Sequence, residues 1–360
     1  MSSLGDFANI FQHAFGIQGV VPNNEAIVSV AQKSFGKEMA MIMFFAMVIN
    51  IMIARFTPWK FIFLTGHHTL FMSMMVAVIL ATAGMTGITL IAVGSLVVGV
   101  AMVFFPAIAH PYMKKVTGSD DVAIGHFSTL SYVLAGFIGS KFGNKEHSTE
   151  DMNVPKSLLF LRDTPVAISF TMSIIFLVTC LFAGADAVKE LSGGKNWFMF
   201  SIMQSITFAA GVYIILQGVR MVIAEIVPAF KGISDKLVPN ARPALDCPVV
   251  FPYAPNAVLV GFLSSFAAGL IGMFTLYLLN MIVIIPGVVP HFFVGAAAGV
   301  FGNATGGRRG AILGAFAQGL LITFLPVFLL PVLGDIGFAN TTFSDADFGA
   351  LGILLGIIVR

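Results

Sequence analysis

The segment FIFLTGHHTLFMSMMVAVILAT, residues 61–82, is apolar and long enough to cross a bilayer, which takes about 20 predominantly apolar residues. Two adjacent histidines, His67 and His68, interrupt it. Ionisable side chains at membrane depth are costly, so they usually face a water-filled cavity or a partner group. The segment therefore predicts a membrane helix that carries part of a polar site.

The composition places the chain among integral membrane proteins. It has 360 residues, of which 58% are hydrophobic and 10% are charged, and its mean hydropathy is +0.95. A soluble domain has roughly 25% charged residues. The apolar residues come in blocks, not in the alternating segments of about ten residues that build a membrane barrel. We expect an all-α, polytopic membrane protein. The net charge of +2 is spread over short polar gaps, so no nucleic-acid partner is predicted.

Membrane spans are predicted wherever an apolar block approaches about 20 residues. Such blocks are residues 38–56, 61–82, 88–109, 165–184, 199–227, 256–280, 281–304 and 308–332, with a last segment from residue 348. Residues 123–142 are apolar but carry His126, Ser128, Thr129 and Ser131. We expect a re-entrant or half helix there, because irregular backbone at membrane depth is tolerated only where protein or water covers it.

The charged loops predict which end of the molecule faces the cytoplasm. Cytoplasmic loops are enriched in Lys and Arg. The loop 141–163 carries Lys141, Lys145, Lys156 and Arg162, and we expect it inside, together with residues 230–245 and the pair Arg308–Arg309. The loop 333–347 has aspartates but no Lys or Arg, so we expect it on the opposite side.

The paired histidines cannot face one site equally, because neighbours on a helix point about 100° apart. One of them, with Thr65 nearby, is expected to contact a solute, while the other packs or bonds the backbone. A structural role for both is the alternative. Adjacent histidines are poorly placed to chelate one ion, and no acidic residue is near in sequence, so no metal site or cofactor is predicted.

Two further polar breaks are candidates for the same site. His126, in IGHFST, has a route to a central cavity if its segment is re-entrant; capping a helix is the alternative. In ALDCPVVFPYAPNAV, residues 244–258, three prolines exclude a regular helix, and such broken segments often mark transporter sites. Asp246 is expected to accept hydrogen bonds from solute hydroxyls, or else to pair with Arg242. Asn256 is a site candidate that could also cap the next helix.

Two other polar groups are interpreted as structural. Gln217, Arg220 and Glu225 lie in an apolar helix, where an interhelical ion pair or snorkelling explains them best. In the stretch VVPNNEA, residues 20–26, Asn23, Asn24 and Glu25 could line a polar site, but a solvated turn before a helix is the simpler interpretation. The chain has no phosphate-binding loop and no nucleophile elbow, so a polar solute held by His, Asp, Asn and backbone groups is the simplest prediction.

Several segments together resemble the ascorbate-type enzyme IIC, the membrane component of the bacterial phosphoenolpyruvate-dependent sugar phosphotransferase system. The resemblance covers nearly the whole chain. It rests on LTGHHTLF, AIGHFSTLSYVLAGFIGSKFGNKEHSTEDMNVP, the run from Gln217 to Phe262, IIPGVVPHFFVGAAAGVFGNATGGRRGA and FSDADFG. It implies that His67 of the TGH segment, His126 of the IGH segment and Asp246 of the A-x-D-C segment bind the solute.

The resemblance also implies a function. It implies a multi-pass permease of the bacterial cytoplasmic (inner) membrane, similar to an elevator, in which a dimerising scaffold holds a solute-carrying core. The family takes up ascorbate or a related sugar or sugar acid. Phosphate passes from a histidine of the soluble IIA partner to a cysteine of IIB and then to the solute, so the phosphorylated nucleophile is not expected on this chain. The alternatives are an ion-coupled transporter or channel for a small polar solute, and a non-transporting sensor or remnant.

The chain departs from the family at three glutamine positions, which here hold Phe71, Met72 and Phe127. Replacing amides with apolar groups changes the hydrogen bonding offered to a polyhydroxylated lactone, so the exact solute stays open. The family also begins with about two more helices. Residues 1–360 are therefore expected to form a single IIC-type domain without those helices and without the C-terminal end.

Overall fold

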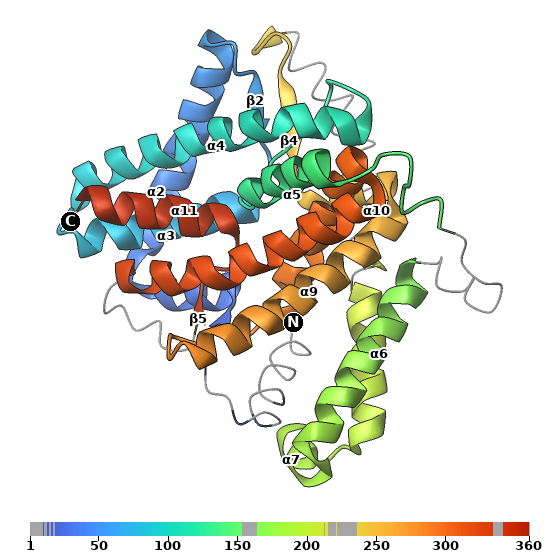
Figure 1. Cartoon of the computed structure of the whole chain (residues 1–360). Helices are drawn as coiled ribbons and strands as arrows, with labels where there is room; N and C mark the ends of the chain where they lie inside the picture. The colour runs from blue at the N-terminus through green and yellow to red at the C-terminus, as the bar shows by residue number, and fades with distance from the viewer. Residues whose placement is uncertain are drawn as a thin grey trace.

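The computed structural model describes residues 19–152, 164–211, 213–214, 236–333 and 341–359, with residues 10, 13, 16 and 221 as isolated positions. Helices dominate the described chain, as the apolar blocks predict (Figure 1). They are α2 (Asn24–Phe56), α3 (Gly66–Thr82), α4 (Gly87–Thr117), α5 (Thr129–Phe142), α6 (Thr164–Ala183), α7 (Ala185–Leu191), α9 (Pro255–Leu278), α10 (Val288–Leu329) and α11 (Ala346–Val359). Residues 197–211 are also helical, and short 3-10 helices are η2 (Cys247–Tyr253) and η3 (Leu330–Val332).

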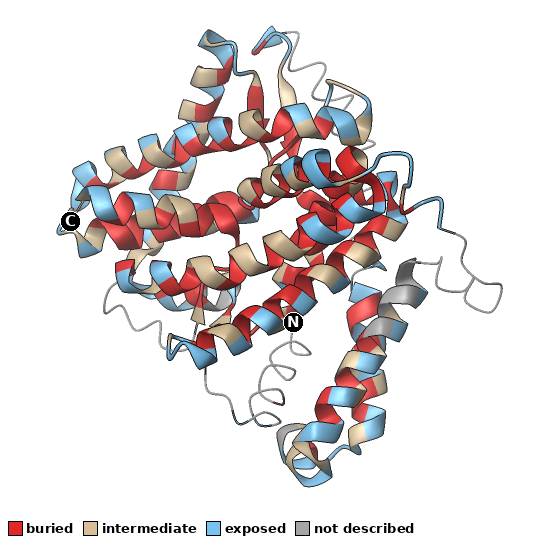
Figure 2. Cartoon of the chain, viewed as in Figure 1, coloured by how far each residue is buried: buried red, intermediate tan, exposed pale blue. Residues whose placement is uncertain are grey.

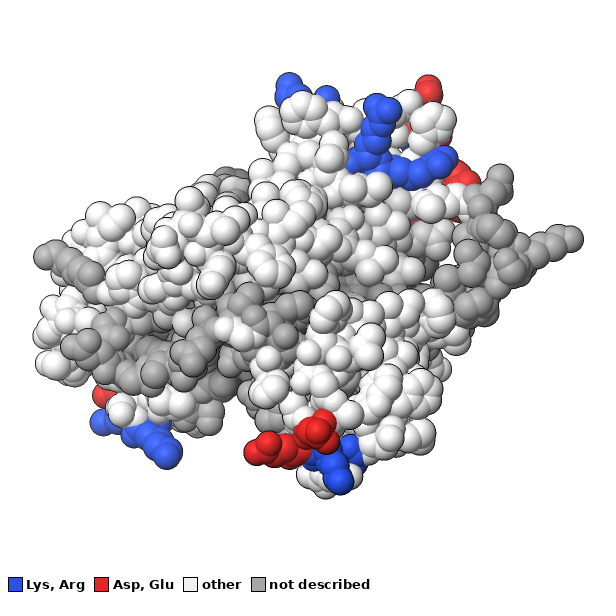
Figure 3. Space-filling view, turned by 60° about the horizontal axis from the view of Figure 1, so that its bottom comes forward, with Lys and Arg blue, Asp and Glu red and all other residues white. Residues whose placement is uncertain are grey.

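The outer surface of the helices suits a bilayer. Within the described residues, four stretches are long and apolar enough to span one, namely 30–56, 87–117, 255–278 and 288–332. Large apolar side chains such as Phe44, Leu96 and Phe274 are exposed on them. Figure 3 shows charged side chains near two opposite edges of one face, with no charged side chain among the described residues between them. Extensive exposed apolar surface marks contact with lipid. The chain is a multi-pass membrane protein.

Helix α10 is two helical arms joined by a reversal of the chain. A single straight helix of 42 residues would be about 60 Å long, twice the hydrocarbon thickness. Gly306 and Gly307 have non-helical backbone angles, and Gly307 has a φ of +59°. A Cβ on Gly302 would lie only 2.6 Å from the carbonyl carbon of Gly310, which a continuous helix would hold far away. The two arms match the separately predicted spans 281–304 and 308–332.

Glycines let α9 and α10 approach at backbone distance. A Cβ on Gly261 of α9 would lie 2.8 Å from the Cα of Gly299 in the first arm of α10. In the second arm, a Cβ on Gly319 would lie 2.9 Å from the Cα of Ser265. Membrane helices associate through such small residues, because lipid removes the hydrophobic drive between them. Both arms therefore pack on α9.

Two small parallel sheets occupy the breaks between helices. In the larger one, β4 (Arg242–Leu245) lies between β2 (Phe61–Phe63) and β3 (Ala123–Ile124), and Figure 1 shows β2 beside β4. In the smaller one, β1 (Val21–Pro22) pairs with β5 (Thr341–Thr342). The larger sheet is almost wholly buried, and Figure 2 shows further buried positions along α3 and α10. Paired, covered strands satisfy the backbone where the helices are interrupted.

The carboxyl ends of these strands decide where the helices begin. α3 starts three residues after β2, and α5 starts five residues after β3. Because neighbouring strands in a parallel sheet run the same way, the residues that follow β2, β3 and β4 emerge at one edge. α5 has only 14 residues, in agreement with the half helix predicted for 123–142.

An ion-pair cluster ties the end of α4 to β4. Asp120 lies 2.6 Å from both Nε2 of His110 and Nζ of Lys114, and the guanidinium of Arg242 donates to its carboxylate and to its backbone oxygen. Partial burial would raise the pKa of Asp120, but the bonds from Lys114, His110 and Arg242 outweigh it and hold that pKa well below its usual range. The first strand residue of β4 is thereby fixed to the loop after α4.

We expect Gly261→Ala to destabilise the packing of α9 on α10, because its methyl group would meet backbone atoms that cannot move aside. Overpacking of this kind costs about 1–3 kcal/mol. The apparent melting temperature of the detergent-purified protein should fall. Gly36→Ala is the matched control, because its nearest neighbour would be the Gln32 side chain at 3.4 Å. Equal melting temperatures for the two variants would contradict the proposed close approach.

The stability of the folded protein is expected to fall at low pH because Asp120 becomes protonated. Its folded-state pKa is lowered, so its contribution is complete above the unfolded value of about 3.9 and is lost as pH falls below it. Melting temperatures measured between neutral pH and pH of about 3 should fall less steeply for Asp120→Asn than for the unmodified protein. Asp121→Asn, whose carboxylate bonds Ser119 instead, should keep the unmodified slope.

Candidate functional site

The edge of the larger sheet brings three predicted site residues together. His67 lies in the first turn of α3, His126 follows β3, and Asp246 follows β4. Nε2 of His67 is 3.6 Å from one carboxylate oxygen of Asp246, and Nε2 of His126 is 3.8 Å from the other. Asp246 also accepts the backbone N–H of Cys247 at 2.7 Å, which starts η2. Arg242 pairs with Asp120, so Asp246 is not the loop partner of Arg242.

The two adjacent histidines have different surroundings. The side chain of His67 is 53% exposed, whereas His68 is buried. Nδ1 of His68 accepts the backbone N–H of Phe127 at 3.3 Å, and its ring stacks on Phe348. A neutral imidazole with an accepting Nδ1 carries its proton on Nε2. His68 thus holds the segment before α5 in place, while His67 keeps free surface.

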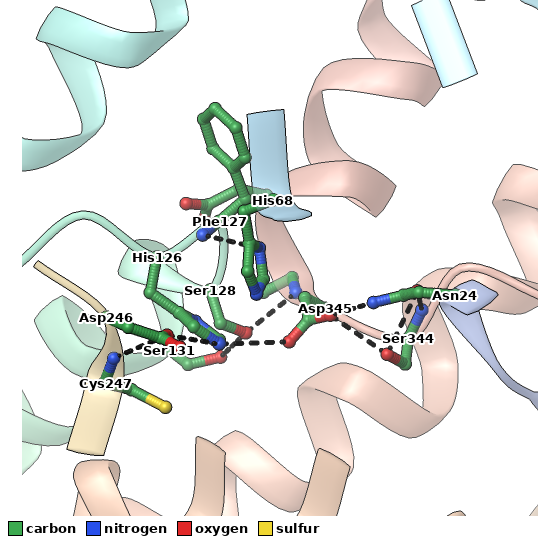
Figure 4. A network of polar contacts seen from close by, with 12 residues as sticks. Asn24, His68, His126, Phe127, Ser128, Ser131, Asp246, Cys247, Ser344 and Asp345 are labelled. Carbon is green, nitrogen blue, oxygen red and sulfur yellow. Dashed lines mark hydrogen bonds and ion pairs between the residues drawn. The ribbon is translucent and has the colours of Figure 1, made fainter. Parts of the chain in front are cut away.

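His126 is oriented by a tyrosine on one side and faces carboxylates on the other. Nδ1 of His126 is 2.8 Å from the hydroxyl of Tyr132, one turn into α5. Its Nε2 lies 3.8 Å from Asp246 and 4.0 Å from Asp345 (Figure 4). These separations are longer than hydrogen bonds. The imidazole therefore faces both carboxylates without bonding either directly.

A second set of residues, from the smaller sheet, closes the cluster. Asn24 follows β1, and its amide donates to Asp345, which follows β5, at 2.6 Å. Ser344 donates to the same carboxylate at 3.0 Å, as Figure 4 shows. The prediction of a solvated turn at residues 20–26 is wrong for Asn24, because its side-chain amide donates a hydrogen bond to the buried carboxylate of Asp345. The sequence signal for this contact, a polar residue after each of two short β-prone pairs, is too weak to select it.

The aspartates after β5 are not in a solvated loop. Asp345 and Asp347 are both buried, so they are not the solvated loop residues that the charge count assumes, and the side of the membrane expected for residues 333–347 stays a prediction. Asp347 accepts the backbone N–H groups of Thr129 and Leu130, each at 2.8 Å. A carboxylate at the start of a helix satisfies donors that the helix leaves unpaired and complements its dipole. Asp347 of α11 thus caps α5.

The remaining candidates lie in different places. Thr65 precedes α3 and is buried, and its hydroxyl has no hydrogen-bond partner among the described residues. Asn256 lies in the first turn of α9, which begins at Pro255, so it does not occupy the cap position. Its amide donates to the backbone oxygen of Thr149 at 3.1 Å, and the described contacts do not join it to the histidines. The predicted structural group Gln217, Arg220 and Glu225 lies outside the described residues.

Phe71, Met72 and Phe127, which we expect at glutamine positions of the family, differ in their surroundings. The Phe71 ring lies 5.8 Å from the ring of His67, edge to face, and forms an apolar wall beside it. Met72 is fully buried. Phe127 is also buried and stacks on Phe63 at 4.6 Å. Phe71 therefore changes the surface that His67 faces, whereas Met72 and Phe127 belong to the packed interior.

The donor atoms are close enough together to bind a metal ion as well as a solute. Three overlapping groups have their nitrogen, oxygen or sulfur atoms within 4.8 Å of one another: His67, His68 and Asp246; His68, His126 and Asp345; and His126, Asp246 and Cys247. The acidic partners come from distant segments, which adjacent residues in the sequence could not reveal. Donors and acceptors gathered from several segments also suit a molecule with several hydroxyl groups.

A multi-pass helical membrane protein whose broken segments meet around a buried polar cluster has the architecture of a membrane transport protein. Comparison with known proteins identifies the kind of transport protein. The family model EIIC-GAT, described as "PTS system sugar-specific permease component", matches residues 1–347, and the chain belongs to this family. The resemblance inferred from the sequence segments is thus confirmed.

One curated relative is the "Ascorbate-specific PTS system EIIC component" of Mycoplasma pneumoniae. It is 30% identical to this chain over 265 residues, which cover 65% of this chain and 38% of the relative. The chain therefore spans well under half the length of that relative.

We expect Asp347→Asn to lower stability. The asparagine NH2 group would replace one of the two oxygens that accept backbone N–H groups at the start of α5, so one of those N–H groups would lose its acceptor. A buried N–H left without an acceptor costs about 1–3 kcal/mol. The apparent melting temperature in detergent should fall accordingly. Asp246→Asn is the control, because asparagine also caps well and Asp246 is only partly buried. A melting temperature that falls equally in both variants would contradict the distinction drawn between the two aspartates.

Proposed function

We propose that the chain is the solute-translocating membrane component of a phosphotransferase system that takes up ascorbate or a related sugar or sugar acid. The family supports the permease role, and the name of the Mycoplasma pneumoniae relative supports the solute class. The single structural observation behind the proposal is the cluster of His67, His126 and Asp246 at one sheet edge, with no contact between them shorter than 3.6 Å. Imidazole and carboxylate groups gathered in this way can exchange hydrogen bonds with hydroxyl groups.

The proposed contacts follow from the donors and acceptors present. The Asp246 carboxylate accepts from solute hydroxyls, and the exposed imidazole of His67 donates or accepts beside it. Nε2 of His126 meets the same solute from the other side, held in position by Tyr132. The free hydroxyl of Thr65 offers a further bond. Asn256 is not included, because its amide is engaged with Thr149.

The partners and the location follow from the same proposal. The solute is phosphorylated by a cysteine-bearing IIB protein that receives phosphate from IIA, so this chain supplies binding and passage but not the phosphorylated nucleophile. The permease acts in the bacterial cytoplasmic membrane as a homodimer, with an elevator-like core moving against a scaffold. The family match does not favour the alternative, an ion-coupled transporter.

Uptake into membrane vesicles tests the proposal. Vesicles containing this chain are loaded with phosphoenolpyruvate and the soluble phosphocarriers, including IIA and IIB, and are given labelled ascorbate. We expect label to accumulate as a phosphate ester. Accumulation of free solute that depends on a proton or sodium gradient would support the alternative instead.

The site residues are tested in the same vesicles. Asp246→Asn and His126→Ala should each reduce uptake at limiting solute by roughly tenfold or more, equivalent to about 1.4 kcal/mol of lost binding. Asp186→Asn removes an exposed carboxylate elsewhere and should leave uptake unchanged. Unchanged uptake in both site variants would show that the solute binds elsewhere.

A further inference from the structure

A second polar site lies at the reversal between the two arms of α10. The loop 143–152 lies across this reversal and is bonded to it on both sides. The backbone N–H of Asn144 donates to Gly306 at 2.8 Å, and the N–H of Arg308 donates to His147 at 2.7 Å. Gly307 is held in a left-handed conformation, and a Cβ there would collide with the backbone of Asn144 and His147. The loop and the reversal are therefore fixed as one unit.

This unit forms a surface cavity of about 370 Å³, open to solvent and lined by the exposed residues Asn144, His147, Arg308 and Arg309. The volume is within the range of small-molecule sites, roughly 300–1,000 Å³. Two of the lining residues come from the loop after α5 and two from the second arm of α10. The cavity is thus shaped by tertiary contacts and is separate from the cluster around Asp246.

The polar side-chain groups of the lining are two guanidinium groups, an amide and an imidazole, and most of their polar atoms are hydrogen-bond donors. Among the described residues, neither Arg308 nor Arg309 has a carboxylate within 4.0 Å, since the recorded ion pairs involve other residues. The side-chain oxygen of Asn144 accepts the N–H of Glu146, which leaves its amide nitrogen as a donor. Two adjacent guanidinium groups match the oxygens of a phosphate better than any neutral group does.

The same loop carries three acidic residues, Glu146, Glu150 and Asp151, and none of them lines the cavity. Glu150 accepts the backbone N–H groups of Asn256 and Ala257 at 3.1 and 3.2 Å, so its charge is used to cap α9. Lys141 and Lys145 flank the loop start and add positive charge at this end of the molecule. Nothing in the described lining offers a carboxylate to repel an anion.

We propose that the cavity lined by Asn144, His147, Arg308 and Arg309 binds the phosphate group of a small phosphate monoester. The binding follows from the lining alone. That its natural ligand is the phosphorylated solute, held at the cytoplasmic end before release, rests on the proposed function. The two arginines contact the phosphate oxygens, and Asn144 and His147 contact the phosphate or the adjoining hydroxyl groups.

Binding is measured by equilibrium dialysis with labelled glucose 6-phosphate, using the whole chain in nanodiscs of phosphatidylcholine. We expect saturable binding that is weakened at least roughly tenfold in the double variant Arg308→Gln/Arg309→Gln. Lys141→Gln/Lys145→Gln removes the same charge from the same end and should change the affinity less than about twofold. Unlabelled glucose, which lacks phosphate, should not compete with labelled glucose 6-phosphate for the cavity.

A conservative double variant shows whether the effect of the glutamine variant comes from lost binding or from misfolding. Arg308→Lys/Arg309→Lys keeps the charge but loses the two-pronged geometry, so intermediate affinity is expected. Absence of saturable binding, or equal loss in the Lys141/Lys145 and Arg308/Arg309 variants, would overturn the proposal.

A second arm of the experiment separates a free monoester from lipid headgroups. In nanodiscs containing phosphatidylglycerol, glucose 6-phosphate should still bind at its own saturable site. If anionic lipid abolishes that binding, Arg308 and Arg309 bind lipid phosphates instead, and the proposal fails. Because the assay requires no uptake, binding without phosphorylating transport would refute the proposed function while leaving this site standing.

Discussion

The requirement that every backbone polar group at membrane depth be satisfied within the protein governs this structure. Helices meet that requirement by themselves, but a helix that begins inside the membrane does not. Here β4 meets it for two neighbours at once. Its carbonyls accept the N–H of Leu64 at 3.0 Å and of Gly125 at 2.6 Å, directly before the residues that lead into α3 and α5. Polar side chains can stand at these helix starts because the backbone around them is already paired.

The helical class and most of the spans could be predicted, because helices that cross a membrane require long blocks of apolar residues. Even the division of α10 was recoverable, since Gly306–Gly307 and the arginines break its apolar run. The histidines and Asp246 could be selected because ionisable residues are rare in such blocks. Their meeting at one edge could not, because strands of two to four residues have no measurable periodicity.

The contact between Asn24 and Asp345 shows the limit most clearly. The two residues are separated by 321 positions, and each follows a strand of two residues. In the sequence both look like turn residues, because short polar side chains next to an apolar run are typical of turns. Asp345 and Asp347 also illustrate how spacing misleads: two residues apart, one faces His126 and the other caps α5. Only the three-dimensional packing of α11 against α5 separates their roles.

The order of the strands in the larger sheet has a consequence for biogenesis. β4 is central, yet it is the last of the three to be synthesised, long after β2 and β3. Until residues 242–245 leave the ribosome, the nascent chain holds two strand segments whose backbone groups lack their partner, next to helices already able to enter the membrane. Those segments must stay hydrated or be sheltered by the insertion machinery. Asp246 arrives with β4, so the contacts of His67 and His126 with this carboxylate form in the same step that seals the backbone, whereas Asp345 joins the cluster later.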